Sequence, residues 1–129
     1  MILQERKLAT LRLLSVCHLL AVAIQPVLAG QYLSGRPEAL GIHAAIGETV
    51  AWLALTLALL ALIYWRRGWL SRWTAGGFVL IFALDGLQLH MGYAKSLAVH
   101  IPLGTFILVL SFAMTAWLWR HAVSPTLRQ

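Results

Sequence analysis

Residues 40–65, LGIHAAIGETVAWLALTLALLALIYW, form the longest of four apolar runs in the chain and decide its fold. The run is long enough to cross the hydrocarbon layer of a membrane, which is about 30 Å thick and takes about 20 helical residues. It also has a polar start, because His43 precedes Gly47 by four residues at its head. The stretch therefore predicts a transmembrane helix with a histidine near one end.

Three further apolar runs of similar length account for most of the remaining chain. The sequence of 129 residues is 60% hydrophobic and 11% charged, with a mean hydropathy of +0.80, which is too apolar for an ordinary soluble domain. We expect a single all-α domain over residues 1–129, a bundle of four transmembrane helices at about 8–29, 40–65, 73–93 and 99–119. The first run begins like a signal peptide, but at about 22 residues it exceeds the usual apolar core of one, so we expect a retained span.

The basic residues gather on one side of the predicted bundle. Eight of the ten flank the same ends of the spans, and they are Arg6, Lys7, Arg12, Arg66, Arg67, Arg72, Arg120 and Arg128. Arg36 and Lys95 lie on the opposite side. This asymmetry predicts cytoplasmic termini and a multi-pass protein of the bacterial inner membrane. The net charge of +6 then attracts anionic lipid, and no nucleic acid partner is expected.

A weak internal repeat suggests two similar helical hairpins joined by RRGWLSR at residues 66–72. The segments IQPVLAGQY at 24–32 and LQLHMGY at 87–93 each end a span and precede a short outer loop. After each loop an H-x-x-x-G motif opens the next span, first with His43 and Gly47 and then with His100 and Gly104. Because both spans start at the same surface, we expect the two imidazoles to lie at similar depth and to face one another.

Two facing imidazoles are a suitable pair of axial ligands for a haem iron. The glycine four residues after each histidine lies on the same helix face, where a side chain would obstruct a flat ligand. We therefore predict one haem b held by His43 and His100 and admitted by Gly47 and Gly104. The alternative is that the two histidines only form hydrogen bonds near the membrane interface.

Three more residues near the outer surface are candidates for the same site. His90 is the rival iron ligand, or it donates a hydrogen bond to a haem propionate. Arg36 and Lys95 are placed to pair with the propionates, or else are solvated loop residues. The chain has no C-x-x-C-H motif, which excludes covalent attachment of a c-type haem, and we expect its lone Cys17 to be a buried thiol.

Polar residues inside the spans are expected to face the bundle interior, because an unpaired polar group in an apolar environment costs about 2–7 kcal/mol. Two stripes of such residues are Asp85, Gln88 and Gly92 on the third span and His18 and Gln25 on the first. Hydrogen bonding between helices is one role for them, and a proton or substrate path is the other. Glu48 lies about 140° around the helix from His43, so we expect it to contact a neighbouring helix instead of the haem.

From Gln25 to about Trp117 the chain resembles one four-helix half of haem A synthase, and more coarsely the small cytochrome b561-like membrane proteins. The residues that carry the resemblance are Gln25, His43, the pair "LQ" at 87–88 with Gly92, and His100. The resemblance implies that His43 and His100 are axial haem ligands. The catalytic half of that family has a glutamate three residues before the first histidine, where this chain has Leu40. This difference favours a non-catalytic haem module over an oxygenating enzyme.

The sequence therefore predicts a single-haem membrane protein that acts in electron transfer or haem handling more than in catalysis. Its expected partners are membrane lipid, a redox partner or a quinone, and a second copy of the chain or a respiratory complex. One alternative is a small proton-coupled multidrug-type transporter that uses the carboxylates of Glu48 and Asp85. Another is a cofactor-free accessory subunit of a respiratory complex.

Overall fold

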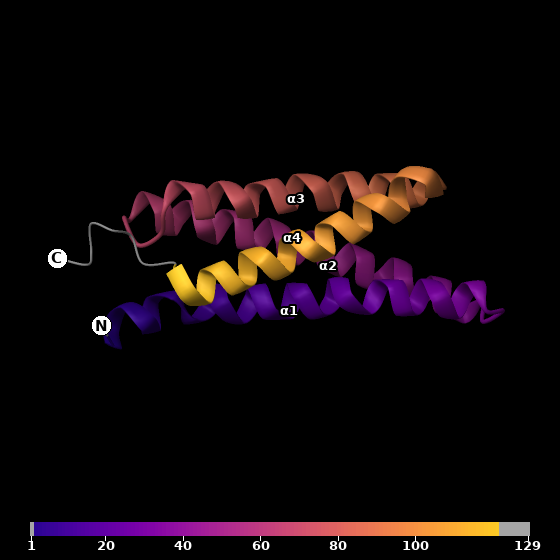
Figure 1. Cartoon of the computed structure of the whole chain (residues 1–129), viewed down its shortest axis with the longest axis horizontal. Helices are drawn as coiled ribbons and strands as arrows, with labels where there is room; N and C mark the ends of the chain where they lie inside the picture. The colour runs from indigo at the N-terminus through magenta and orange to yellow at the C-terminus, as the bar shows by residue number, and fades with distance from the viewer. Residues whose placement is uncertain (1, 122–129) are drawn as a thin grey trace.

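The protein is a bundle of four long helices, described by a computed structural model whose secondary structure covers residues 2–121 and whose side chains cover residues 8–120 (Figure 1). The helices are α1 (Ile2–Leu33), α2 (Glu38–Arg66), α3 (Arg72–Tyr93) and α4 (Leu97–His121). No strand occurs in residues 2–121. Each predicted span lies inside one helix, and all four helices are long and apolar enough to cross a membrane.

The connections between the helices are short, and successive connections lie at opposite ends of the bundle. The α1–α2 and α3–α4 connections lie at one end of the bundle, and the α2–α3 connection lies at the other end beside the start of α1 (Figure 1). We call the first the histidine end, because it holds His43 and His100, and the second the basic end, because it holds Arg66, Arg67 and Arg72. The turns after α1 and α2 contain Gly35 and Gly68 with φ of +89° and +71°, a conformation that favours glycine.

The four helices pack in a square. Helix α1 contacts α2 and α4, and α3 contacts the same two helices, so α1 faces α3 across one diagonal and α2 faces α4 across the other. The apolar core is largest toward the basic end and consists of Leu8, Leu11, Ala54, Leu57, Ala61, Leu70, Ala75, Phe78, Ile81 and Leu118. A smaller cluster of Val22, Val50 and Ile107 lies nearer the histidine end. The diagonal centre is therefore where side chains from non-adjacent helices meet.

Polar side chains are buried and large apolar side chains are exposed, which is the arrangement expected of a bundle in lipid. The buried polar residues are Arg12, Ser15, His18, Thr74, Asp85, Ser111 and Thr115. The expectation that Cys17 is buried is wrong, since its thiol is exposed. Cys17 follows Leu13 by four residues and precedes Leu20 by three, and both leucines are exposed, so the cysteine lies on the outward face of α1.

Arg12 lies inside the bundle near the basic end, although its position close to the start of the first apolar run suggested a flanking charge. Its side chain is buried, and its Nε donates to the carbonyl oxygen of Leu118 at 3.4 Å. Its guanidinium carbon lies 5.3 Å from the centroid of the Trp119 ring. Further arginine–tryptophan pairs at the same end are Arg66 with Trp65, Arg67 with Trp69 and Arg72 with Trp73. These pairs place indole rings and positive charges together, as at a membrane interface.

One buried polar pair joins the first diagonal. His18 of α1 donates through Nε2 to the Oδ2 atom of Asp85 on α3 at 2.8 Å, and both residues are almost fully buried. The expected hydrogen bonding between these two helices is therefore present. Because α1 and α3 do not pack directly on one another, this contact fixes the separation and register of the two helices across the bundle centre.

Removing one partner of this pair is expected to destabilise the bundle. In an Asp85→Leu variant the His18 ring keeps a buried donor without an acceptor, which costs about 2 kcal/mol or more. The double variant His18→Leu, Asp85→Leu removes both polar groups and is expected to recover at least half of the loss. Thermal unfolding in detergent measures the effect, with Leu87→Ala on the exposed face of α3 as the matched control. Equal destabilisation by the single and double variants would contradict the pairing.

Candidate functional site

The imidazoles of His43 and His100 meet across the second diagonal of the bundle, at the histidine end. Their ring centroids lie 6.0 Å apart and the ring planes are inclined by 65°. His43 lies near the start of α2 and His100 near the start of α4, and both helices begin at this end. The two rings therefore lie at similar depth, and each is only partly exposed.

Both rings are held in the same way by a backbone carbonyl of the preceding helix. The Nδ1 atom of His43 donates to the carbonyl oxygen of Gln25 at 3.2 Å, and the Nδ1 atom of His100 donates to the carbonyl oxygen of Gln88 at 3.0 Å. A carbonyl oxygen only accepts, so each Nδ1 carries the proton. In a neutral imidazole the lone pair then lies on Nε2. Each histidine thus presents Nε2 as an acceptor or metal ligand.

The side chain of Gln88 contacts the same nitrogen of His100. Its Nε2 amide donates to Nε2 of His100 at 3.3 Å, which agrees with the tautomer set by the carbonyl bond. The amide of Gln25 occupies the equivalent place beside Gly47. Together His43, His100, Gln25 and Gln88 form what we call the histidine–glutamine cluster. It draws one residue from each of the four helices.

The glycines near the cluster make room for the glutamine amides and for one ring. A Cβ atom added to Gly104 would lie 2.7 Å from the Nε2 atom of Gln88, and one added to Gly47 would lie 3.8 Å from the Nε2 atom of Gln25. A Cβ atom on Gly92 would lie 3.0 Å from Cε1 of His100. The flexible ends of two glutamines therefore lie beside Gly47 and Gly104, and a Cβ atom at Gly47 would make only an ordinary contact with them. The predicted role of the two glycines in admitting a haem stays a prediction.

The glutamine amides carry polar atoms that have no partner. Both side-chain polar atoms of Gln25 and the Oε1 atom of Gln88 are buried without a hydrogen bond. Such atoms are uncommon, because burying an unpaired amide costs free energy, and they often mark the place of a bound molecule. The cluster therefore has unused hydrogen-bonding atoms on both glutamines, and the amide of Gln88 lies next to Nε2 of His100.

The donor set fits a haem iron better than a bare metal ion. Within the residues that the structure describes, no group of three or more His, Cys, Asp or Glu side chains could hold a metal ion. A haem iron needs only two protein ligands, because the porphyrin supplies four nitrogens. Two imidazoles on opposite sides of one iron, at nitrogen–metal distances of about 2 Å, have ring centroids about 6 Å apart. The separation of 6.0 Å between His43 and His100 is close to that spacing, and it is equally the spacing of two rings in direct edge-to-face contact.

The other residues predicted for the site belong to the same end of the bundle. His90, Arg36 and Lys95 are exposed, and the contacts described for residues 8–120 join none of them to His43 or His100. Lys95 has φ of +56°, which places it in the tight turn before α4 at the histidine end. Their predicted roles as rival ligand and as propionate partners stay predictions.

Glu48 faces away from the cluster, on the side of α2 that packs toward α3. Its carboxylate is exposed and accepts a hydrogen bond from the hydroxyl of Tyr93. The expectation that it contacts a neighbouring helix is confirmed. The sequence did not indicate the part played by the Gln25 and Gln88 carbonyls or by Gly92. The repeated glutamine before each H-x-x-x-G motif was the one available signal for them.

Comparisons with known proteins identify no relative of this chain. No protein-family model, no curated protein and no solved structure matches the chain. The fold is a bundle of four helices that are long and apolar enough to span a membrane, and its candidate site is the histidine–glutamine cluster at one end.

Proposed function

We propose that the protein is a membrane cytochrome that binds one haem b through Nε2 of His43 and Nε2 of His100. The observation that carries the proposal is the pair of hydrogen bonds from Nδ1 of each histidine to a glutamine carbonyl. Ligating histidines generally donate their other ring proton to such an acceptor, which fixes the tautomer and the ring orientation. The ring separation of 6.0 Å supports the same assignment.

A haem in this site supplies one-electron redox chemistry. Ligation by both His43 and His100 would leave no coordination site open on the iron, which favours electron transfer over oxygen chemistry. The carbonyls of Gln25 and Gln88 orient the imidazoles and raise their basicity through the Nδ1 protons. The amide of Gln88 would have to leave Nε2 of His100 for this nitrogen to bind iron, and the unpaired atoms of Gln25 and Gln88 could then bond at the edge of the site.

Two basic residues at the histidine end would pair with the propionates of a haem. Arg36 and Lys95 are exposed there and would neutralise the two carboxylates. Among the residues described, a second pair of facing histidines is absent, since His18 pairs with Asp85. We therefore propose a single haem near one surface and not a chain of haems across the membrane.

An absorption spectrum of detergent-purified protein from haem-supplied cells tests the assignment. The protein is expected to show a sharp Soret band and a reduced α band of a six-coordinate b-type haem. His43→Ala and His100→Ala are each expected to lower the haem content at least tenfold, because each removes an axial ligand. His90→Ala is the matched control and is expected to keep the spectrum.

Three results would overturn the proposal. A colourless protein whose Glu48→Gln variant loses substrate-driven proton movement would indicate the transporter. A colourless protein that purifies only with respiratory subunits would indicate an accessory subunit. Loss of the spectrum in His90→Ala with retention in His43→Ala would assign the ligand role to His90.

We further propose that the basic end lies in the cytoplasm of a bacterial cell and that the histidine end faces outward. The support is the distribution of charge, with Arg66, Arg67 and Arg72 at one end and Arg36 and Lys95 at the other.

Reporter proteins fused to the carboxyl terminus show on which side of the membrane the basic end lies. We expect a green fluorescent protein fusion to fluoresce and an alkaline phosphatase fusion to be inactive, because only the first works in the cytoplasm. A phosphatase fusion placed after Lys95 is the matched control and is expected to be active. The opposite pattern would place the histidine end inside the cell.

A further inference from the structure

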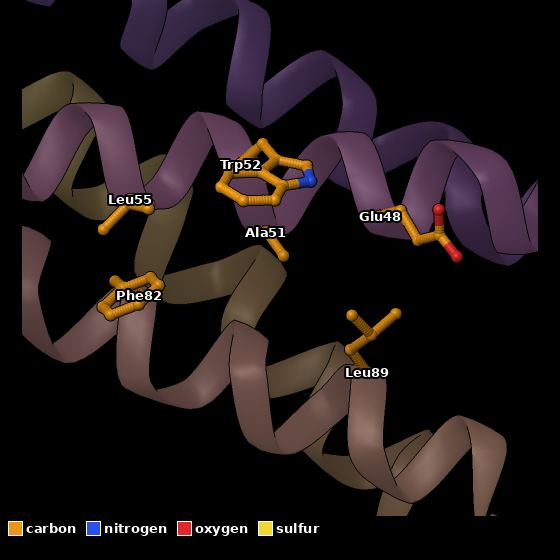
Figure 2. A pocket seen from close by; sticks show the side chains of 6 residues that line it. All are labelled: Glu48, Ala51, Trp52, Leu55, Phe82 and Leu89. Atoms are coloured by element: carbon orange, nitrogen blue, oxygen red, sulfur yellow. The ribbon is translucent and has the colours of Figure 1, made fainter.

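A groove on the outside of the bundle runs between α2 and α3 beside the histidine–glutamine cluster. It has a volume of about 380 Å³, which is within the range of small-molecule sites. It is lined by Glu48, Ala51, Trp52, Leu55, Phe82 and Leu89. Figure 2 shows Glu48 and Leu89 at one end of the groove, Leu55 and Phe82 at the other, and the Trp52 ring between them. The groove is therefore polar at one end and apolar along the rest.

The polar end holds a carboxylate within a helix that is apolar enough to span the membrane. Glu48 lies ten residues after Glu38, the first residue of α2, which places it about 15 Å along the helix. A carboxyl group inside a membrane span is costly unless it has hydrogen-bond partners. Tyr93 supplies one donor, and a carboxylate has room for several. A bound molecule with a hydroxyl group would supply another.

The groove and the cluster share a wall. The Cδ1 atom of Leu89 lies 3.8 Å from where a Cβ atom on Gly47 would be, and Leu89 also lines the groove. Gly47 faces the amide of Gln25 at the same distance. One side chain therefore separates the groove from the cluster, and a molecule in the groove would lie next to the proposed haem.

The chemistry of the lining selects the occupant. Glu48 repels the phosphate of an anionic phospholipid and accepts from a neutral hydroxyl. The rings of Trp52 and Phe82 favour a flat aromatic group, and the open side toward lipid leaves room for an apolar tail. We propose that the groove binds the head group of a lipid-soluble hydroquinone, with a ring hydroxyl donating to Glu48.

The proposal rests on the proposed haem function for its electron acceptor. Oxidation of a hydroquinone to a quinone breaks two O–H bonds and releases two electrons and two protons. A single haem, if bound as proposed, would take these electrons one at a time and pass each to a one-electron redox partner before the next, and Glu48 would accept the first proton and pass it, like the second, to water at the histidine end. Tyr93 orients the Glu48 carboxylate in this arrangement.

Photolabelling of the protein in nanodiscs of phosphatidylethanolamine and phosphatidylglycerol tests the binding site. A photoactivatable azidoquinone is expected to label residues of 48–55 and 82–89, and excess decylubiquinone is expected to lower the labelling at least tenfold. Ala51→Trp fills the groove and is expected to lower it to the same extent. Leu59→Trp, at an exposed position of α2 outside the groove, is the matched control. Glu48→Gln is expected to weaken competition by decylubiquinone about tenfold, the effect of losing a hydrogen bond to a charge.

The same labelling in the double variant His43→Ala, His100→Ala separates the two proposals. Groove labelling with a colourless wild-type protein would reject the haem and retain the quinone site. A red protein with labelling scattered over all four helices would reject the quinone site and retain the haem. Labelling by a photoreactive phospholipid that decylubiquinone does not displace would assign the groove to lipid. If two copies of the chain cross-link to each other near Trp52 and the cross-link blocks labelling, the groove would be assigned to a second copy.

Discussion

The structure depends on one constraint, which is that polar groups within an apolar layer must find their partners inside the bundle. Four helices in a square offer two diagonals for this purpose, and each diagonal carries a histidine contact. His18 pairs with Asp85 between α1 and α3, and His43 lies against His100 between α2 and α4. The outward faces stay apolar, with exposed side chains such as Leu13 and Leu20. The polar interior therefore determines how the helices are arranged around the centre.

The orientation of the two facing imidazoles follows from packing between adjacent helices. His43 is held by a carbonyl of α1, and His100 by a carbonyl of α3. Each histidine thus depends on the helix that precedes it in the chain, while the contact between the rings crosses the bundle. A shift of α1 along α2 would turn the first ring, and a shift of α3 along α4 would turn the second. The orientation of the two rings therefore depends on how far each helix is shifted along its neighbour.

A small residue links the interior site to the outer surface. Gly47 contributes no side chain, so the amide of Gln25 approaches it from inside the bundle and Leu89 approaches from the groove. The groove beyond Leu89 ends at the carboxylate of Glu48, which Tyr93 holds in place. The histidine–glutamine cluster and the groove are thus neighbours across a thin wall, although their residues face opposite sides of α2.

The sequence by itself determined the four helices and showed that His43 and His100 occupy equivalent positions near the starts of two of them. Hydropathy and the H-x-x-x-G spacing are local properties, so they can be read from the sequence. It also indicated that Asp85 and His18 face inward, since a polar group in an apolar span needs a partner. It misplaced Cys17, because one small residue does not reveal which face of a helix meets lipid. Only the tertiary structure decided that the carbonyls of Gln25 and Gln88 hold the imidazoles. Every residue has a carbonyl, so the packing of one helix on the next, and not the side-chain sequence, selects the one that a histidine reaches.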